Sequence, residues 1–160
     1  MIFVTLGNQN FQFNRLLIAL ERLVEEGIIN EEIIIQCGHT DYKSDLFKTV
    51  TFLGKKEFDI YIETANYVIS HAGTGSIVNC LKKGKKVLVA ARLSKYGEHI
   101  DDHQKEILFA FEKMKLIVGL DHELKDFKDK VENLQNIRLE KFVSNNESFN
   151  KELIKIIEQL

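Results

Sequence analysis

The stretch ISHAGTGSIVNCL, residues 69–81, contains an abrupt change of pattern. An apolar run ends at Ser70, a segment rich in glycine and hydroxyl groups follows, and a helical pattern starts directly afterwards. This junction is typical of a parallel βαβ unit, in which a buried strand leads into a helix. Gly73 and Gly75 would let the backbone approach a ligand closely, while the first amides of the helix point outward.

The hydroxyl groups of Thr74 and Ser76 add hydrogen-bond donors to those amides. Together these groups suit a phosphate or a diphosphate, which a helix N-terminus also favours electrostatically. The alternative is a tight turn without a ligand, in which Ser76 only caps the helix. The motif taken alone leaves both interpretations open.

The same alternation continues on both sides of this motif. Short apolar runs predict buried strands at residues 2–6, 32–37, 50–53, 67–70, 86–91 and 116–119. Amphipathic periodicity predicts helices over residues 14–26, around 58–65, directly after the glycine motif, from near Asp101, and over 124–134 and 147–160. This order predicts a Rossmann-like α/β fold, with a parallel sheet and helices on both faces, as one domain over residues 1–160.

Composition and charge narrow the class of protein. The chain has 160 residues, of which 44% are hydrophobic and 29% charged, as in ordinary globular domains. A net charge of -2 disfavours nucleic-acid binding, so we interpret the run KKGKK at 82–86 as a solvated loop. The start MIFVTLGN resembles neither a signal peptide nor a membrane span, and Cys37 and Cys80 fit reduced thiols, which together favour a cytoplasmic protein.

Ligands of such sheets bind beyond the carboxyl ends of the strands. That rule selects the segments 7–13, 71–76 and 92–104. Arg15 follows the first segment and is interpreted either as a contact for an anion or as a surface residue. No G-x-G-x-x-G follows the first strand and no P-loop lysine is present, which disfavours a nicotinamide dehydrogenase.

The segment GEHIDDHQ, residues 97–104, admits three interpretations. His99 and His103 stand four residues apart beside carboxylates and could be read as metal ligands. Asp101 and Asp102 also fit the cap and first turn of a helix, with surface histidines around them. The third interpretation, which we favour, is a polar loop that contacts a ligand, and we expect no bound metal.

Four segments in this order resemble one family: MIFVTLGN at the start, FNRL at 13–16, SHAGTGSI at 70–77 and YGEHIDDHQ at 96–104. Over residues 1–117 the chain resembles the donor-binding, catalytic subunits of split family 28 glycosyltransferases. These include the soluble half of the two-part UDP-GlcNAc transferase of N-glycan assembly and the bacterial capsular and exopolysaccharide counterparts. The resemblance implies the fold of the C-terminal half of a GT-B enzyme and a UDP-sugar as donor substrate, with no cofactor.

The resemblance also implies roles for individual residues. Those expected at the donor diphosphate are Gly7, Asn8, His71, Gly73, Thr74, Gly75 and Ser76. Those expected toward the sugar and phosphate end are Glu98, His99, His103 and Gln104. Phe52 and Leu53 would border the uracil, and Asn79 stands at the ribose position, where relatives usually carry an acidic residue. No catalytic base is assigned in this chain, because the partner half is its expected source.

The implied function is that of a UDP-sugar-binding subunit of a two-component inverting hexosyltransferase. It would add a sugar to a lipid-linked acceptor in capsular or exopolysaccharide synthesis, and would be active only with its partner. That partner would be a membrane-associated acceptor-binding subunit, which would recruit this chain to the inner face of the cell membrane. The alternatives are a non-catalytic subunit that keeps the fold, and a stand-alone enzyme such as an epimerase.

The closing segment has an apolar stripe made of Phe149, Leu153, Ile156, Ile157 and Leu160. Such a stripe buries itself against another surface. One interpretation is that this stripe packs on the chain's own domain. The other is that it docks against the partner half or against the membrane surface.

Overall fold

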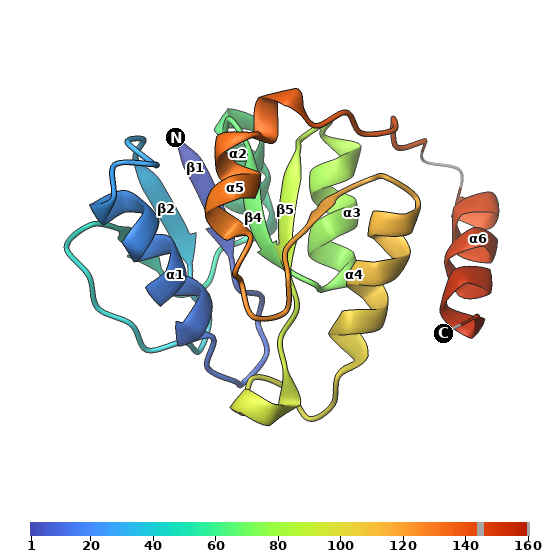
Figure 1. The fold of residues 1–160 in the computed structure, drawn as a ribbon, viewed down its shortest axis with the longest axis horizontal. Coiled ribbons are helices and arrows are strands. Elements are labelled where there is room, and N and C mark those ends of the chain that lie inside the picture. Colours follow the sequence, from blue (N-terminus) through green and yellow to red (C-terminus); the bar gives the residue numbers. More distant parts are fainter. Residues whose placement is uncertain (144–145, 160) are drawn as a thin grey trace.

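A six-stranded sheet with every strand parallel forms the centre of the fold (Figure 1). The structure, a computed structural model, describes residues 1–143 and 146–159. The strands are β1 (Ile2–Thr5), β2 (Ile33–Gln36), β3 (Lys48–Val50), β4 (Val68–His71), β5 (Val87–Ala90) and β6 (Val118–Gly119). Their order in space is β3-β2-β1-β4-β5-β6, which confirms the predicted parallel α/β fold.

Helices cover both faces of this sheet. They are α1 (Asn14–Glu25), α2 (Lys55–Thr64), α3 (Thr74–Lys82), α4 (His103–Lys113), α5 (Phe127–Glu132) and α6 (Asn146–Glu158), with short 3-10 turns at Ser94–Tyr96 and Leu134–Asn136. The side chains of a strand point alternately to the two faces, and β1, β2, β4 and β5 each contribute to two separate cores. Helices α1 and α5 pack on one core, and α2, α3 and α4 pack on the other.

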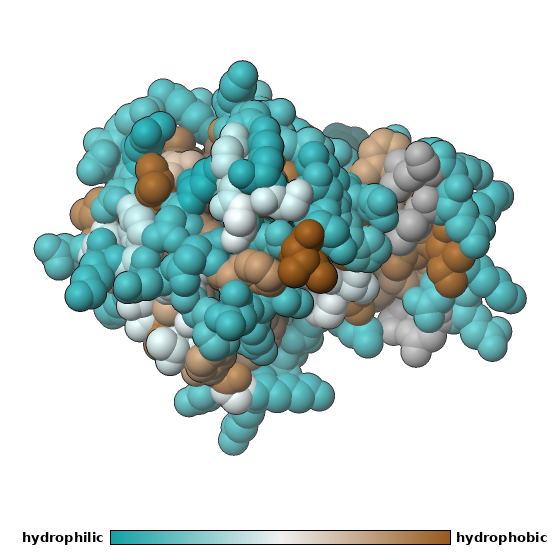
Figure 2. All heavy atoms as spheres, turned by 90° about the horizontal axis from the view of Figure 1, so that it is seen from below, coloured by the Kyte–Doolittle hydropathy of each residue, from teal (hydrophilic) through white to brown (hydrophobic). Residues whose placement is uncertain are grey.

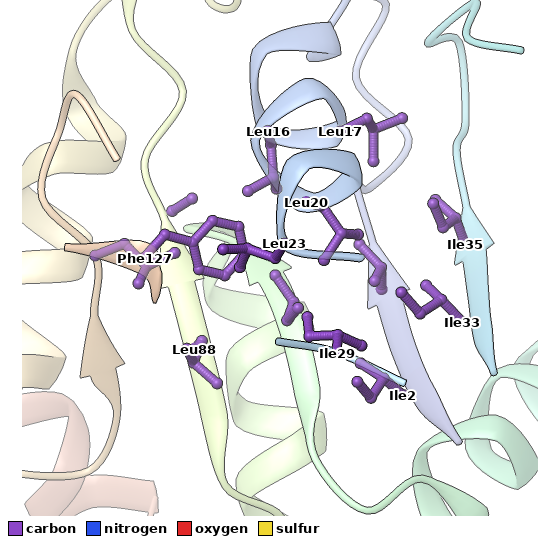
Figure 3. Packing of buried hydrophobic residues seen from close by; sticks show 14 of the residues in the cluster. Ile2, Leu16, Leu17, Leu20, Leu23, Ile29, Ile33, Ile35, Leu88 and Phe127 are labelled. Carbon is purple, nitrogen blue, oxygen red and sulfur yellow. The ribbon is translucent and has the colours of Figure 1, made fainter. Parts of the chain in front are cut away.

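The first core shows why α1 forms where its sequence pattern predicts. Leu16, Leu20 and Leu23 recur on one face of the helix and are at most 5% exposed. Figure 3 shows these leucines between α1 and the strands, with Phe127 of α5 beside Leu23, in the same core as Ile2 and Ile33. Burial of such a stripe supplies most of the stability of a helix this short.

The third strand lies earlier in the chain than predicted. The apolar run at 50–53 predicted a strand there, whereas β3 spans Lys48–Val50 and pairs only with β2 at the edge of the sheet. Its register places Lys48 opposite Ile34 and Val50 opposite Gln36. Lys48 and Thr49 are exposed polar residues, as is common on edge strands, so hydrophobicity did not indicate the start of β3. Phe52 lies beyond the strand and is 51% exposed.

The C-terminal helix α6 packs against α4 of the same domain. The Phe149 ring lies 5.6 Å from that of Phe111, and Ile156 is 8% exposed. Packing on its own domain is therefore the interpretation that fits these residues. Leu160 and the side chain of Ile157 lie outside the part of the chain that the structure describes.

Both cysteines are buried free thiols, as the sequence predicted. Burial raises the pKa of Cys80 to about 12. Across residues 1–143 and 146–159, no helix has both the length and the apolar character that crossing a membrane would need.

The strand order reverses beside β1. The chain passes from β1 to β2 on one side and later returns to place β4 on the other side. The loops after β1 and β4 therefore leave neighbouring strands in opposite directions, which opens a crevice at the carboxyl edge of the sheet. Ligands of open α/β sheets bind in such a crevice.

Candidate functional site

A cavity of about 400 Å³ lies at the reversal point. It is lined by Thr5, Gly7, Asn8, Gln36, Leu53, Lys55, Phe58, Gly75 and Ser76. The structure thus brings together the loop after β1, the start of α2 and the first turn of α3. Among these residues, Gly7, Asn8, Gly75 and Ser76 were expected at a diphosphate and Leu53 at a uracil.

Four lining residues were missed by the sequence reasoning: Thr5, Gln36, Lys55 and Phe58. Thr5 and Gln36 are polar residues at the carboxyl ends of β1 and β2, so the strand-end rule could have found them. Lys55 begins α2 and brings a positive charge to the cavity wall. Figure 2 views this edge of the sheet from below, and the surface there is mostly hydrophilic with scattered hydrophobic groups.

Gln36 holds the floor of the cavity. Its side-chain oxygen accepts a hydrogen bond of 2.7 Å from the hydroxyl of Thr5, and its Nε2 donates to the carbonyl of Gly7 at 3.1 Å. Nε2 also lies 3.3 Å from the side-chain oxygen of Asn8. Gln36 is 2% exposed, so its side-chain amide is shielded from solvent and holds the loop after β1 in place.

His71 ends β4 and its ring lies between the backbones of Gly7 and Gly73. A β-carbon at either glycine would overlap the imidazole, and Gly7 also has a φ of +73°. Both glycines are therefore required by the packing of His71. The two loops that border the cavity meet across this ring.

Two hydrogen bonds hold the His71 ring. Its Nδ1 lies 3.2 Å from Nε2 of Gln104, and its Nε2 lies 3.3 Å from Oγ of Ser76. Burial, with additional repulsion from Arg92 and His99, lowers the pKa of His71 to about 3. The imidazole is therefore neutral at physiological pH.

This pKa predicts how stability depends on pH. The folded pKa of about 3 lies below the ordinary value of 6.5, so as the pH falls below 6.5 the unfolded chain binds a proton that the folded chain excludes. His71 therefore costs no stability above pH 6.5 and lowers the free energy of unfolding by about 1.4 kcal/mol per pH unit below it. We expect urea denaturation of the wild type to lose about 2 kcal/mol more than His71→Gln between pH 7 and 5. Equal losses in the two proteins would contradict this prediction.

Gly75 differs from Gly7 and Gly73. A β-carbon there meets no atom within 4 Å, so the fold does not require glycine at this position. Gly75 nevertheless lines the cavity, in the first turn of α3 after the exposed Thr74. We therefore expect a larger side chain at residue 75 to narrow the cavity.

Arg15 and Glu98 bind each other instead of facing an open anion site or a sugar. The Arg15 guanidinium donates two hydrogen bonds to the Glu98 carboxylate, at 2.9 and 3.0 Å, and a third to the carbonyl of His122 at 2.6 Å. The guanidinium also lies over the Tyr96 ring, 4.9 Å from its centre. The Glu98 side chain is 3% exposed and accepts a further bond from the amide of Leu93. Arg15 therefore binds the carboxylate of Glu98 as its anionic partner.

Gln104 is also used inside the protein rather than at the cavity wall. Its side-chain oxygen accepts hydrogen bonds from the amides of Ala72 at 3.2 Å and Arg92 at 3.1 Å. The residue is 4% exposed, and its side chain contacts the backbone directly after β4 and after β5. Gln104 does not line the cavity and is linked to it through His71, which contacts Ser76.

Arg92 ties the loops of the carboxyl edge together. It is 1% exposed, and its guanidinium donates to the carbonyls of Leu6, Phe11, Gln12 and Glu98. Burial lowers the pKa of Arg92 to about 10, an effect that the nearby Glu98 carboxylate opposes. The guanidinium remains charged at physiological pH and holds the loop after β1 against the loop after β5.

His99 and His103 have separate carboxylate partners. Nδ1 of His99 lies 3.0 Å from Asp101, and Nδ1 of His103 lies 3.0 Å from Glu106 in the first turn of α4. Across the described part of the chain, no group of three or more histidine, cysteine, aspartate or glutamate side chains is arranged to hold a metal ion.

Asn79 and Phe52 lie outside the cavity lining. The Asn79 amide donates a 3.0 Å hydrogen bond to the carboxylate of Asp59, so α2 supplies an acidic group beside this position of α3. Phe52 packs edge-on against His39, at 5.2 Å between ring centres, whereas its neighbour Leu53 lines the cavity.

Comparison with known proteins identifies the family. Residues 1–160 match the glycosyltransferase family 28 C-terminal domain. The chain belongs to this family. This match confirms the predicted class, a glycosyltransferase domain.

Two yeast relatives bear the name UDP-N-acetylglucosamine transferase subunit ALG13. The chain is 31% identical to that of Kluyveromyces lactis over 139 residues, which is 87% of this chain and 61% of the relative. It is 30% identical to that of Candida albicans over 101 residues, which is 63% of this chain and 32% of the relative. This family 28 domain therefore spans between about a third and two thirds of these relatives.

Solved structures support the GT-B half-fold. An NMR structure of ALG13 aligns over 98% of this chain and 96% of its own, with a TM-score of 0.58 and 21% identity. The glycosyltransferase SnogD from Streptomyces nogalater aligns over 99% of this chain but 38% of its own, with a TM-score of 0.56 and 14% identity. The family 28 domain thus has the fold of one half of a larger GT-B enzyme, as predicted.

Proposed function

We propose that this chain is the UDP-sugar-binding subunit of a two-component inverting glycosyltransferase. The cavity carries the proposal, because Gly75 and Ser76 of the α3 N-terminus face Gly7 and Asn8 across it. Its volume of about 400 Å³ lies in the range of small-molecule sites, roughly 300–1,000 Å³. The yeast relatives are named as subunits of a UDP-N-acetylglucosamine transferase, which makes UDP-GlcNAc the first donor to test.

The chemistry of the cavity suits a diphosphate leaving group. Transfer breaks the bond between the sugar C1 and the β-phosphate oxygen, so negative charge grows on the departing UDP. The free amides and positive end of the α3 dipole favour that charge, and Lys55 adds a full positive charge at the wall. These groups would lower the barrier to departure of UDP without any movement of the backbone.

The same cavity lacks a group that could activate the acceptor. Inversion requires a base to take the proton of the attacking acceptor hydroxyl. Within the part of the chain that the structure describes, the cavity lining includes no carboxylate and no imidazole. A separate subunit that supplies the base and binds the acceptor accounts for this lining. We propose that the two subunits act together at the inner face of the cell membrane on a lipid-linked acceptor. The GEHIDDHQ segment makes capsular or exopolysaccharide synthesis the proposed pathway.

Calorimetric titration tests the proposal directly. We expect the purified chain to bind UDP and one of UDP-GlcNAc, UDP-glucose and UDP-galactose more tightly than uridine, because the diphosphate makes the contacts with the α3 N-terminus. We also expect the chain alone to transfer sugar to a lipid-linked acceptor far more slowly than the chain with its partner. Absence of UDP binding would favour the non-catalytic alternative, and full transfer by the single chain would refute the two-component assignment.

A further inference from the structure

The hydrogen bonds around His71 have a direction that can be derived from the structure. Gln104 is the starting point, because its side-chain oxygen accepts from two backbone amides, those of Ala72 and Arg92. An amide NH₂ group cannot accept from those donors, so the orientation of the Gln104 side chain is determined. Its Nε2 therefore faces His71 as a donor.

The donor from Gln104 selects one tautomer of the imidazole. Nδ1 of His71 lies 3.2 Å from Gln104 Nε2 and must accept, so it carries no proton. A neutral imidazole has one N–H, which then lies on Nε2. That N–H faces the hydroxyl oxygen of Ser76 at 3.3 Å.

The last link is Ser76. A hydroxyl group has one proton and two acceptor positions, and accepting from His71 uses one of the latter. Within the described residues, the Ser76 hydroxyl has no other hydrogen-bond partner, and Ser76 lines the cavity. Its proton is therefore available to a group in the cavity.

We infer that His71 and Gln104 are positioning residues that commit the Ser76 hydroxyl to donate a hydrogen bond into the cavity. The ligand group that this arrangement selects is one that only accepts, such as an ionised phosphate oxygen of a nucleoside diphosphate. This inference rests on the proposed function for its ligand, whereas the direction of the bonds rests on the protein alone. The same arrangement gives the buried, neutral His71 a role beside an anion site. It contributes the orientation of a donor, whereas a lysine would contribute a positive charge.

The direction can be reversed with one substitution. Gln104→Glu keeps the side-chain shape and the oxygen that accepts from Ala72 and Arg92, but places an acceptor opposite His71 Nδ1. The imidazole proton then moves to Nδ1, Nε2 becomes an acceptor, and the Ser76 hydroxyl turns toward His71. The Ser76 hydroxyl would then no longer donate into the cavity. Its oxygen lone pair would face the cavity instead and repel a phosphate oxygen.

The tautomer is measured without any ligand, by the imidazole ¹⁵N shifts of His71 at pH 8. We expect the wild-type proton on Nε2 and the Gln104→Glu proton on Nδ1. UDP titration should show a loss of affinity of about tenfold or more in Gln104→Glu and also in Ser76→Ala. Adding Ser76→Ala to Gln104→Glu should change affinity less than about twofold, because that hydroxyl no longer donates to the ligand.

Gln135→Glu is the matched control, since Gln135 is exposed and the change adds the same charge outside the cavity. It should leave both the His71 tautomer and UDP affinity unchanged. A wild-type proton on Nδ1 would overturn the inference, as would independent, additive losses from Gln104→Glu and Ser76→Ala. If the wild-type chain carries the His71 proton on Nε2 but binds no UDP, the proposed function is refuted. The derived direction of the His71 hydrogen bonds would then still hold.

Discussion

Gly75→Leu is expected to abolish UDP binding while leaving the fold intact. A β-carbon at residue 75 meets no atom within 4 Å, and residue 75 lines the cavity, so we expect the leucine side chain to fill part of the cavity without clashing with the protein. It would occupy the space in front of the first α3 amides, and we expect affinity to fall by about 100-fold or more, equivalent to about 2.7 kcal/mol. Leucine also favours a helix over glycine, so thermal stability should stay equal or rise.

Two control variants make the result specific. Gly75→Ala adds only a methyl group and should retain most of the affinity, with a gain in stability of about 0.5–1 kcal/mol. Lys82→Leu places the same side chain at an exposed position near the end of α3 and should leave UDP binding unchanged. Normal UDP binding by a folded Gly75→Leu protein would show that the glycine motif is only a turn.

Arg92→Met should cause the largest loss of stability among single substitutions at the carboxyl edge. Methionine keeps much of the apolar stem but removes the donors to the carbonyls of Leu6, Phe11, Gln12 and Glu98. The buried carbonyls of Leu6 and Glu98 would each lose a donor, at about 1–3 kcal/mol each, so we expect the free energy of unfolding to fall by about 2–6 kcal/mol. Urea denaturation should show this decrease, and UDP affinity should fall as well because the loop containing Gly7 is no longer held.

Arg22 provides the comparison for this experiment. It is an exposed arginine in the last turn of α1, so Arg22→Met should change the free energy of unfolding by less than about 0.5 kcal/mol. A decrease below about 1 kcal/mol for Arg92→Met would mean that its hydrogen bonds contribute little to stability. The guanidinium would then have to be needed for another reason.

The carboxyl edge contains two classes of polar residue that look alike in the sequence. Asn8 and Ser76 line the cavity, whereas Glu98 and Gln104 are buried behind it and hold other groups in place. Substitutions in the second class therefore act through His71 or Arg15 and should affect both stability and binding. Substitutions such as Gly75→Leu should affect binding alone.

The sequence predicted the class of fold because burial has a local signature. The alternation of apolar runs with amphipathic stretches predicted each strand and helix, with the largest displacement at the edge strand β3. The same pattern placed Gly7 and the glycine motif at strand ends, where a parallel sheet binds its ligands. Both results depend on residues close together in the chain.

Only the tertiary structure decided which polar side chains meet. Arg15 binds Glu98, 83 residues away, and Gln104 binds His71, 33 residues away. Such pairs depend on how far apart neighbouring loops lie and on how their side chains compete for donors and acceptors, and neither leaves a periodic pattern in the sequence. The sequence by itself therefore determined the α/β fold and predicted a ligand loop after β4, and packing decided that Ser76 lines the cavity while Arg15 does not.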